Sequence, residues 1–283
     1  MRVLVTGANG FVGNHVITYL LSRGIDVIAS SRNIQKAKEY TWYHSVQFIE
    51  FDFYADFENI SLHNYFDKPD ILIHLAWDGL PNFNNLIHIE RNLFSQYKFL
   101  SNYIDSGGKH VLITGTCFEY GLQNGCLSED IPTNPITAYG IAKDALRKFL
   151  EVRYPNHYDL IFQWVRLFYM YGNGQHPKSI IPQLANAIKN GDSTFNMSGG
   201  EQTRDYLPVE TVAEYISKIA LQNNVRGIIN CCSGNPISIK QLVENYINSN
   251  SSKIKLNLGY YPYTNYEPMH FWGKNCRLKT ILK

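Results

Sequence analysis

A tyrosine and a lysine four residues apart are the strongest candidates for chemistry in this sequence. They stand in the segment Tyr139-Gly-Ile-Ala-Lys143, and on a helix this spacing places both side chains on one face. A free tyrosine has a pKa of about 10, so it exchanges a proton near neutral pH only when a nearby positive charge lowers that value. Lys143 can supply the charge. The pair therefore predicts a general acid/base that moves a proton at a substrate oxygen.

A threonine upstream adds a hydroxyl to this pair. Thr116 follows an apolar segment that is expected to be a strand, and open parallel sheets bind ligands at the C-terminal ends of their strands. Its hydroxyl could hydrogen-bond the reacting oxygen. The neighbouring Cys117 has no histidine in the local pattern to activate it, so we interpret it as a packing residue. Glu119 fits either an acid near the site or a salt-bridged structural role, and we assign it no chemistry.

The neighbouring sequence elements indicate whether a tyrosine-lysine pair is catalytic, because the same spacing also occurs by chance. At the N-terminus, Arg2–Val5 predicts a buried strand and Phe11–Ser22 a helix, with Gly7, Gly10 and Gly13 at and after the turn between them. The glycines allow a sharp turn, a close approach of backbone to phosphate oxygens and tight packing of helix on strand. The helix N-terminus then faces the negative charge. A glycine-rich turn of another α/β protein is the alternative, but this context favours a bound dinucleotide.

The tip of the second predicted strand indicates which dinucleotide binds. The strand covers Asp26–Ser30, and its tip lies beside the adenosine ribose, where a carboxylate would select the two free hydroxyls. Asp26 is at the wrong end, whereas Arg32 can pair with a 2′-phosphate. NADP(H) is therefore favoured over NAD, unless Arg32 is only a solvated loop residue. Asp52, just past the third strand, fits either a contact to the adenine amino group or a cap.

Apolar strands alternate with helices up to Gly174. This alternation predicts an α/β fold with a doubly wound parallel sheet covered on both faces. Beyond that point Gly, Asn, Ser, Pro and Tyr are frequent, which predicts a smaller, loop-rich lobe, and the tail Tyr260–Trp272 is expected to pack as an aromatic lid rather than to form a partner surface. The further predicted strands are Val46–Phe51, Ile71–Ala76, His110–Thr114 and Leu160–Leu167, and the further helices are Ile87–Ile104, Ala138–Arg153, Ile180–Asn190, Val209–Gln222 and Ile239–Ile247.

The composition excludes several other classes of protein. Twenty-six basic and 24 acidic residues leave a net charge of +2, which argues against nucleic acid or a membrane surface as the partner. Five cysteines form no Cys-x-x-Cys pair, so we expect no metal site and no disulfide framework, and a reducing, cytoplasmic compartment fits. No apolar run is long enough for a membrane span, and glycine breaks the N-terminal strand before it could serve as a signal peptide.

Together these segments resemble the extended short-chain dehydrogenase/reductases of the nucleotide-sugar epimerase and dehydratase group, over nearly the whole chain. The resemblance implies a Rossmann-type domain of residues 1–170 plus about 206–231 and a substrate-binding lobe of about 171–205 and 232–283. The matching segments are Thr6–Gly13, His74–Ala76, Asn92, Thr116 with Tyr120 and Gly121, Tyr139–Lys143, Arg166–Gly172, and Gln202–Tyr206 followed by Val209.

The resemblance also implies roles for individual residues. Tyr139 would be the general acid/base, Lys143 would bind the nicotinamide ribose, and Thr116 would orient the substrate oxygen, with Cys117 beside the substrate. Arg204 would meet the diphosphate of a nucleotide sugar, an anion that suits a guanidinium. The implied cofactor contacts are Gly7, Gly10, Phe11, Val12, Gly13, Ser31, Arg32, Asn33, Asp52, Phe53, Leu75, Ala76, Trp77, Asn92, Tyr139, Lys143 and Phe168.

Departures from the family pattern narrow the expected reaction. The 4,6-dehydratases place an Asp-Glu pair after the threonine, where this chain has Cys117 and Phe118, so elimination of water lacks its acid and base. Epimerases of the group recycle a tightly held NAD, whereas Arg32 favours exchangeable NADPH. We therefore expect NADPH-dependent reduction of the C4 keto group of a nucleotide-linked 4-keto-6-deoxyhexose, for surface polysaccharide. Residues 115–121 and 267–273 resemble bacterial reductases that convert TDP-4-keto-6-deoxyglucose to TDP-fucose.

Three alternatives stay open at this point. They are a nucleotide-sugar 4-epimerase, a CDP-linked dideoxyhexose reductase, and an NADP-sensing binding protein without activity. The intact set of Thr116, Tyr139 and Lys143 argues against a sensor, which needs none of the three. The helices at residues 87–104 and 138–153 correspond to those that form a four-helix dimer contact in relatives, so the resemblance also implies a homodimer.

Overall fold

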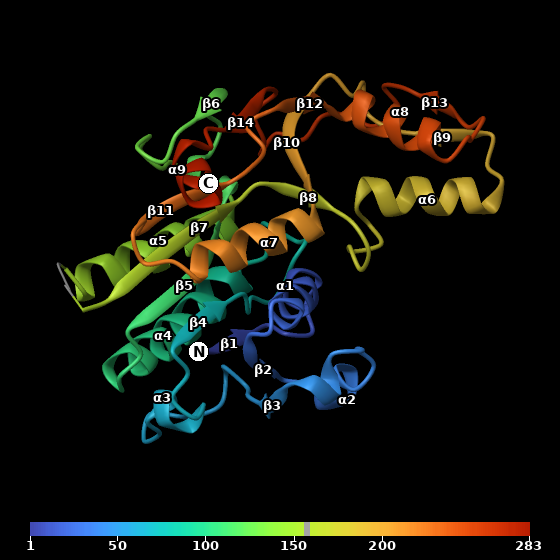
Figure 1. The fold of residues 1–283 in the computed structure, drawn as a ribbon. Coiled ribbons are helices and arrows are strands. Elements are labelled where there is room, and N and C mark those ends of the chain that lie inside the picture. Colours follow the sequence, from blue (N-terminus) through green and yellow to red (C-terminus); the bar gives the residue numbers. More distant parts are fainter. Residues whose placement is uncertain (156–158) are drawn as a thin grey trace.

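A seven-stranded parallel sheet forms the centre of the computed structural model, which describes residues 1–155 and 159–283 (Figure 1). The strand order is β3-β2-β1-β4-β5-β7-β11, and all neighbours run parallel. The order reverses between β1 and β4, which is where open α/β sheets bind ligands. The predicted fold class is confirmed. The strands are β1 (Arg2–Thr6), β2 (Asp26–Ser31), β3 (Gln47–Glu50), β4 (Ile71–His74), β5 (His110–Thr116), β7 (Ile161–Leu167) and β11 (Gly227–Cys231).

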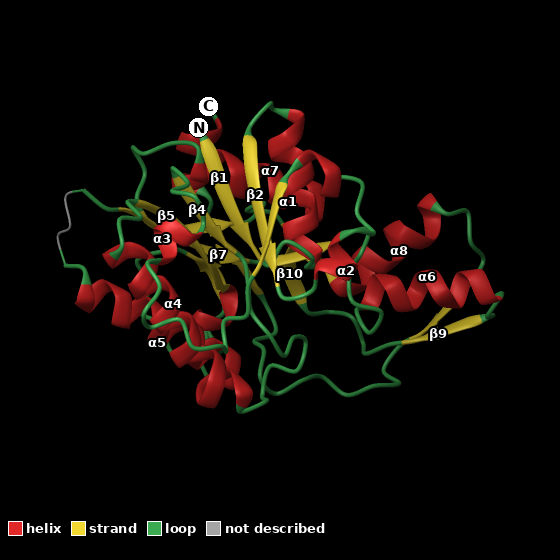
Figure 2. Cartoon of the chain, turned by 90° about the horizontal axis from the view of Figure 1, so that it is seen from below, coloured by secondary structure: helices red, strands yellow, loops and turns green. Residues whose placement is uncertain are grey.

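Helices cover both faces of this sheet (Figures 1 and 2). On β1, Val3 and Val5 face one hydrophobic core and Leu4 faces the other, because successive strand residues point to opposite sides. The first core packs against α1 (Phe11–Ser22), α7 (Val209–Ala220) and α9 (Cys276–Leu282). The second packs against α3 (Leu62–Tyr65), α4 (Phe94–Asp105) and α5 (Ala138–Arg153). The short helix α2 (Ile34–Ala37) follows β2.

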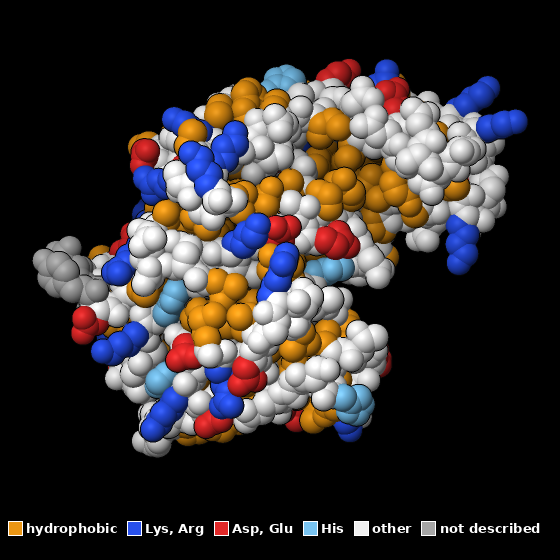
Figure 3. All heavy atoms as spheres, viewed as in Figure 1, with side chains coloured by type: hydrophobic (Ala, Val, Ile, Leu, Met, Phe, Trp, Pro, Cys, Tyr) orange, Lys and Arg blue, Asp and Glu red, His pale blue; other side chains and the backbone are white. Residues whose placement is uncertain are grey.

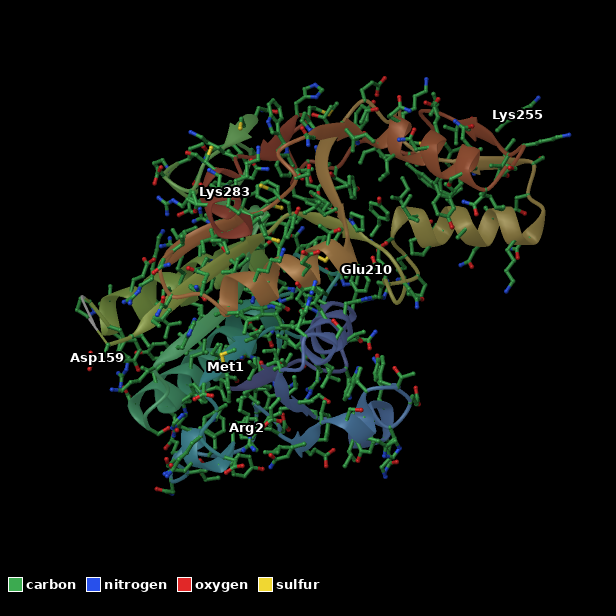
Figure 4. All side chains as sticks on the ribbon, in the orientation of Figure 1. Met1, Arg2, Asp159, Glu210, Lys255 and Lys283 are labelled. Atoms are coloured by element: carbon green, nitrogen blue, oxygen red, sulfur yellow. The ribbon has the colours of Figure 1, made fainter. Side chains whose placement is uncertain are left out.

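A smaller lobe is built from the later part of the chain. It contains the mixed sheet β12-β10-β8 and the parallel pair β13-β9, and Lys255 projects from its outer tip (Figure 4). Leu184, Phe195, Met197 and Val243 give the lobe a core of its own. Its elements are β8 (Tyr169–Tyr171), α6 (Ile180–Asn190), β9 (Thr194–Asn196), β10 (Thr203–Pro208), β12 (Pro236–Ser238), α8 (Ile239–Ser249) and β13 (Lys255–Asn257), and β6 (Gly125–Leu127) pairs with β14 (Phe271–Gly273).

Several predicted elements differ from the observed ones. The predicted helix Ile87–Ile104 is divided, because residues His88–Leu93 form a π-helix (η2) that precedes α4. The strand β5 continues to Thr116, two residues beyond the prediction. The strand β11 was not predicted, because its sequence Gly-Ile-Ile-Asn-Cys has only a short apolar run. Two 3₁₀ turns, η1 (Tyr43–Ser45) and η3 (Cys117–Tyr120), complete the elements.

The expected aromatic lid at Tyr260–Trp272 is only partly correct. Phe271 is buried and Tyr266 is partly buried, but Tyr260, Tyr261 and Tyr263 are exposed. The segment before Tyr266 forms no strand or helix that would press these rings onto a core. The domain boundaries given above stay a prediction, and the C-terminal helix α9 packs on α7 and β11 of the large sheet. No helix in the described parts of the chain is long and apolar enough to cross a membrane.

Candidate active site

Glycine is required at two positions here, one in the turn after β1 and one in the first turn of α1. Gly7 has a φ of 71°, and a Cβ there would lie 2.8 Å from the backbone nitrogen of Ala76. A Cβ at Gly13 would lie 2.2 Å from the carbonyl oxygen of Gly7, so a side chain would push α1 away from the turn. The close packing of helix, turn and β4 therefore depends on these two glycines, as the sequence predicts.

The start of α1 is suited to hold an anion. Gly10 is its N-cap, no side chain caps the helix, and no acidic residue stands in its first turn. The first backbone N–H groups of a helix have no partner within the helix, and the helix dipole places partial positive charge there. A cleft of about 290 Å³ opens at this point. Uncapped N–H groups beside a cleft of this kind fit the pyrophosphate of a dinucleotide cofactor.

The cleft brings together about half of the predicted cofactor contacts. The residues from the prediction that line it are Gly7, Gly10, Ser31, Arg32, Asn33, Phe53, Leu75, Ala76 and Trp77. Sequence reasoning missed Asn9, Lys36, Tyr54, Asp78 and Gln96, which also line it. The sequence could have indicated Lys36, because it stands four residues after Arg32 and adds a second cation at the adenosine end of the cleft. The positions of Tyr54 and Asp78 depend on loop geometry that no local pattern indicates.

The other predicted contacts lie outside this cleft. Phe168 is buried in a cluster with Tyr120 and Phe271. Asn92 is buried and donates from Nδ2 to the carbonyl oxygen of Asp78 at 2.9 Å. Phe11, Val12, Gly13 and Asp52 also do not line the cleft, nor do Tyr139 and Lys143, which belong to the reacting centre.

Arg32 is not a free surface cation. Its Nη2 lies 2.7 Å from Oδ1 of Asp78, in the loop after β4, and its guanidinium lies 5.4 Å from the centre of the Tyr54 ring. The exposed Asp52 accepts a hydrogen bond from the backbone N–H of Tyr54 at 3.0 Å, so in the free chain its carboxylate stabilises the turn after β3. Of the two roles left open for Asp52, the structure shows this local turn contact.

The reacting centre is positioned by the junction of β5, η3 and α5. Thr116 ends β5, and its Oγ1 accepts a hydrogen bond from the backbone N–H of Phe118 at 3.3 Å. The Thr137 hydroxyl caps α5 by accepting from the N–H of Gly140 at 3.1 Å. A Cβ at Gly140 would lie 2.8 Å from the carbonyl oxygen of Phe118, so only glycine lets α5 begin this close to η3. These contacts place Thr116 beside the first turn of α5, which carries Tyr139.

Tyr139 and Lys143 are both buried on α5, with 8% and 2% of their surface exposed. Burial raises the pKa of the Tyr139 phenol, and the nearby Glu119 and Cys117 raise it further. A hydrogen bond with the Thr116 side chain lowers it by a smaller amount. Burial lowers the pKa of the Lys143 ammonium to about 7, against a smaller opposing effect of Glu119. In the free chain, burial therefore outweighs any lowering of the Tyr139 pKa by Lys143. The predicted lowering by Lys143 together with an oxidised nicotinamide concerns the enzyme with its cofactor and stays a prediction.

Aromatic side chains enclose the reacting centre. The Trp77 ring lies 4.0 Å from Nζ of Lys143, and Phe83 and Phe118 stack on each other with ring centres 4.5 Å apart beside Tyr139. The backbone N–H of Tyr139 donates to the carbonyl oxygen of Phe83 at 2.9 Å. The loop after β4 therefore closes over this part of α5 and excludes water.

A buried histidine fixes the Trp77 ring. His88 Nδ1 accepts a hydrogen bond from Nε1 of Trp77 at 3.0 Å, so its Nε2 carries the proton and donates to the carbonyl oxygen of Asn82 at 2.8 Å. Burial lowers the pKa of His88, which keeps this neutral form. Sequence reasoning missed His88, which the π-helix η2 brings beneath Trp77 together with Asn92, one turn further along.

Glu119 is a structural carboxylate. Its side chain is fully buried and accepts hydrogen bonds from Nε of Arg166 at 2.7 Å, Nε1 of Trp164 at 2.9 Å and the backbone N–H of Thr116 at 2.9 Å. Both carboxylate oxygens are thus occupied, and the last of these bonds holds Thr116 in place. Of the two roles left open from the sequence, the structure shows the salt-bridged one. Cys117 is buried, and burial raises the pKa of its thiol, which agrees with a packing role.

A second cleft of about 600 Å³ lies between the smaller lobe and the loop after β4. Figure 3 shows hydrophobic side chains gathered where the lobe borders the hollow between the two parts of the molecule. Arg204 is at the cleft wall with 3% of its surface exposed, and its Nη2 lies 3.0 Å from Oε2 of Glu267. Tyr169 donates a short hydrogen bond to the same carboxylate. Arg204 therefore lies at the wall of this cleft, where Glu267 offsets its charge, and the sequence did not indicate this ion pair.

The sequence is similar to those of several known proteins. A family model described as "NAD dependent epimerase/dehydratase family" matches residues 3–232. A protein of Aggregatibacter actinomycetemcomitans named dTDP-6-deoxy-L-talose 4-dehydrogenase (NAD(+)) is 30% identical over 276 residues, which cover 96% of this chain and 99% of that protein. The dTDP-4-dehydro-6-deoxyglucose reductase of Escherichia coli is 26% identical over 86% of this chain and 79% of its own length.

The fold is also shared with solved structures. UDP-glucose-4-epimerase from Stenotrophomonas maltophila, determined with bound NAD and formylated UDP-arabinopyranose, superposes with a TM-score of 0.86 at 18% identity. The match covers 100% of this chain and 92% of that protein. At this identity the likeness shows the arrangement of the sheet and the smaller lobe, and the details of each site rest on the contacts described above.

Proposed function

The chain belongs to the NAD dependent epimerase/dehydratase family, and on this premise we propose that it reduces the C4 keto group of a nucleotide-linked 4-keto-6-deoxyhexose with NADPH. The family and the named relatives make it an NAD(P)-dependent enzyme of the oxidoreductase/epimerase type that acts on nucleotide sugars. The proposal is carried by the enclosed set of Thr116, Tyr139 and Lys143 with no carboxylate pair after the threonine.

Each of these residues has a separate task in the proposed reaction. When bound, the nicotinamide cofactor supplies the hydride for C4 of the sugar. Tyr139 donates its phenolic proton to the C4 oxygen, and the Thr116 hydroxyl hydrogen-bonds that oxygen as negative charge develops on it. Lys143 stabilises the tyrosinate that remains. The turn at Gly7 and the first N–H groups of α1 hold the pyrophosphate.

The Tyr139 phenol is protonated in the free site. Burial raises its pKa, so at neutral pH it carries the proton that the proposed reduction uses, and Lys143 and the bound cofactor would have to make that proton easier to release. The enclosure by Trp77, Phe83 and Phe118 keeps water away from that proton.

The proposed substrate is TDP-4-keto-6-deoxyglucose, and the product is TDP-fucose for surface polysaccharide. The Escherichia coli relative is named as a reductase of a dTDP-4-dehydro-6-deoxyglucose, which favours this substrate class. The second cleft is large enough for the nucleotide and sugar, and Arg204 in its wall is assigned to the diphosphate. Cys117 does not line this cleft but borders a smaller pocket beside Tyr169 and Glu267, and it is assigned to the sugar side. A CDP-linked dideoxyhexose would need the same protein contacts at C4.

A specific observation favours a second candidate. The relative with 30% identity is named as a 4-dehydrogenase of dTDP-6-deoxy-L-talose, so the second candidate substrate is the 4-keto sugar that corresponds to this product, which differs from TDP-4-keto-6-deoxyglucose at ring carbons other than C4. A 4-epimerase stays the alternative of another type, since it would use the same Tyr139 but consume no cofactor. The products distinguish all three.

NADPH is proposed because the adenosine end of the first cleft carries Ser31, Arg32 and Lys36. We also propose a homodimer in the cytoplasm. The two helices assigned to the dimer contact expose apolar side chains, namely Phe94 at the start of α4 and Ile141, Phe149 and Val152 on α5. These side chains are candidates for burial against a second copy.

The deciding experiment mixes the purified protein with NADPH and TDP-4-keto-6-deoxyglucose and follows the near-ultraviolet absorbance of NADPH. Loss of that absorbance, with a C4 alcohol identified by NMR, is expected, and its configuration separates fucose from 6-deoxyglucose. A second assay with the 4-keto sugar that corresponds to dTDP-6-deoxy-L-talose tests the talose candidate, because that product needs a substrate with a different configuration at ring carbons other than C4. Conversion of a nucleotide sugar to its C4 epimer without net use of NADPH would establish the epimerase instead. No turnover with several nucleotide 4-keto sugars would overturn the reductase proposal.

A further inference from the structure

We propose that Asp78 is a determinant of cofactor choice, because its carboxylate holds Arg32 in the free enzyme and competes with the 2′-phosphate of NADP(H) for that guanidinium. The inference deepens the proposed function, since it rests on the assignment of Arg32 to the 2′ position of the adenosine ribose. It concerns a residue for which the sequence pattern gave no role.

The two residues come from opposite sides of the first cleft. Arg32 follows β2, Asp78 follows β4, and both line the cleft that also contains Gly7 and Gly10. Arg32 Nη2 and Asp78 Oδ1 are 2.7 Å apart, and the two side chains are 44% and 35% exposed. A ligand entering the adenosine end can therefore reach this ion pair.

Asp78 is held in place independently of Arg32. Its Oδ2 lies 3.0 Å from the Tyr54 hydroxyl, and its backbone carbonyl accepts a hydrogen bond from Nδ2 of Asn92 at 2.9 Å. The Tyr54 hydroxyl also lies 2.5 Å from Oδ1 of Asn92, and the guanidinium of Arg91 stacks over the Tyr54 ring at 3.6 Å. When Arg32 turns to a ligand, these contacts keep the carboxylate at the cleft.

Asp78 is also the one carboxylate among the described residues that line this cleft. A 2′-phosphate carries between one and two negative charges, so to pair with Arg32 it must displace Asp78 from Nη2 or share the guanidinium with it, and in both cases it lies near a like charge. A 2′-hydroxyl meets no such opposition and can donate a hydrogen bond to the carboxylate. Asp78 therefore weakens the binding of NADPH relative to that of NADH, although Arg32 and Lys36 favour NADPH.

The test compares the affinities for NADPH and NADH of the wild-type protein and the Asp78→Asn variant. Trp77 lines the cleft, so quenching of tryptophan fluorescence reports binding of cofactor alone, without substrate. Asparagine keeps the backbone contact to Asn92 and an oxygen for Tyr54. We expect roughly tenfold tighter binding of NADPH and less than about a threefold change for NADH, as removal of a nearby like charge predicts.

Two further variants make the result specific to this ion pair. Asp130→Asn removes the same charge from another arginine-aspartate pair with a 2.7 Å contact, to Arg277 on α9, and should leave both affinities unchanged. In an Arg32→Gln background, the gain from Asp78→Asn should be smaller, because relief of the like-charge repulsion remains but there is no guanidinium left to release. Thermal melts verify that each variant is folded.

A ratio of the two affinities that stays within about twofold of wild type in Asp78→Asn would overturn the inference. An equal gain with Arg32 already replaced would overturn it as well. The proposed function fails separately, through the wild-type protein: a wild type that binds NADH more tightly than NADPH would contradict the proposed cofactor, whereas the role of Asp78 is read from the change in the ratio.

Discussion

Lys143 donates a hydrogen bond from Nζ to the carbonyl oxygen of Thr114 at 2.8 Å, which ties the lysine of α5 to the strand that ends in Thr116. The Trp77 ring covers the other side of the ammonium at 4.0 Å. The lysine is therefore fixed relative to both the strand-end threonine and the loop that encloses the site. The geometry of the reacting centre is already formed in the free chain.

Replacement of Tyr139 by phenylalanine should abolish most activity and leave the cofactor site intact. The phenol is the proposed proton donor, and general acid catalysis contributes roughly 10²–10⁴-fold in rate, so turnover should fall by about that factor. The ring packing against Trp77 and Phe83 is kept in the variant. Steady-state kinetics measures turnover, and fluorescence titration measures the affinity for NADPH, which should change by less than about twofold.

Tyr103 provides a matched control for that prediction. It is a buried tyrosine on α4, and none of the described residues offers its hydroxyl a hydrogen-bond partner. Tyr103→Phe removes the same oxygen from the core of the same domain and should retain full activity. A Tyr139→Phe variant that turns over like Tyr103→Phe would exclude Tyr139 as the acid.

Lys143 should make stability depend on pH in a defined direction. Its pKa is lowered in the folded chain to about 7 from an ordinary 10.5, because burial disfavours the ammonium. Between those values the unfolded chain holds a proton that the folded chain lacks, so the free energy of unfolding rises with pH across this window. Below about pH 7 both states are protonated and the full penalty is present. Lys143→Met removes the penalty.

The stability of Lys143→Met relative to wild type should therefore be highest at or below neutral pH and decline as pH rises toward the ordinary lysine value. We expect a decline of at least about 1 kcal/mol, or about 2–4 °C in melting temperature, between roughly pH 6.5 and pH 9.5. Lys218→Met is the control, because Glu214 raises the pKa of that exposed lysine and the difference should be small. A pH-independent difference for Lys143→Met would contradict the lowered pKa.

The parts of this site that follow from local sequence were predicted correctly. The turn at Gly7 needs a positive φ and allows no side chain, and Tyr139 and Lys143 share a helix face because of their spacing alone. Such features depend on a few consecutive residues, so a single sequence is sufficient to indicate them. The alternation of apolar strands with helices likewise indicated the parallel sheet.

The parts that were missed depend on contacts between distant segments. Asp78 meets Arg32 across 46 positions, and Glu267 meets Arg204 across 63, so no local pattern links the partners. The raised pKa of Tyr139 was missed for a similar reason. The spacing of Tyr139 and Lys143 indicated a cation near the phenol. The aromatic side chains that exclude solvent from it come from other segments, the loop after β4 and η3.

Glu119→Gln should destabilise the protein strongly. The carboxylate is fully buried against Arg166, and its removal leaves a guanidinium with 1% exposure without its counter-charge. Breaking a buried ion pair in this way costs about 3–5 kcal/mol, which corresponds to a fall on the order of 10 °C in melting temperature. Thermal unfolding followed by circular dichroism measures the fall.

The double variant Glu119→Gln with Arg166→Met tests the cause. It removes both charges, and Met can fill the space beside Tyr120, so the melting temperature should recover by several degrees relative to Glu119→Gln alone. Persistent activity per folded molecule in the double variant would fit the structural role assigned to Glu119. A single variant that melts within about 2 °C of wild type would contradict the burial argument.

Arg204 should control the affinity for the nucleotide sugar and not that for the cofactor. Its guanidinium lies at the wall of the second cleft, and loss of charge-assisted bonds to a diphosphate should raise KM for the nucleotide sugar by roughly 10–100-fold with a smaller change in kcat. Arg204→Gln alone would leave Glu267 without its cation, so the double variant with Glu267→Gln separates the two effects. Arg277→Gln, which loses an exposed pair on α9, is the control and should leave KM unchanged. The assignment of Arg204 fails if the double variant keeps a wild-type KM, because nothing else in that variant would restore a lost diphosphate contact.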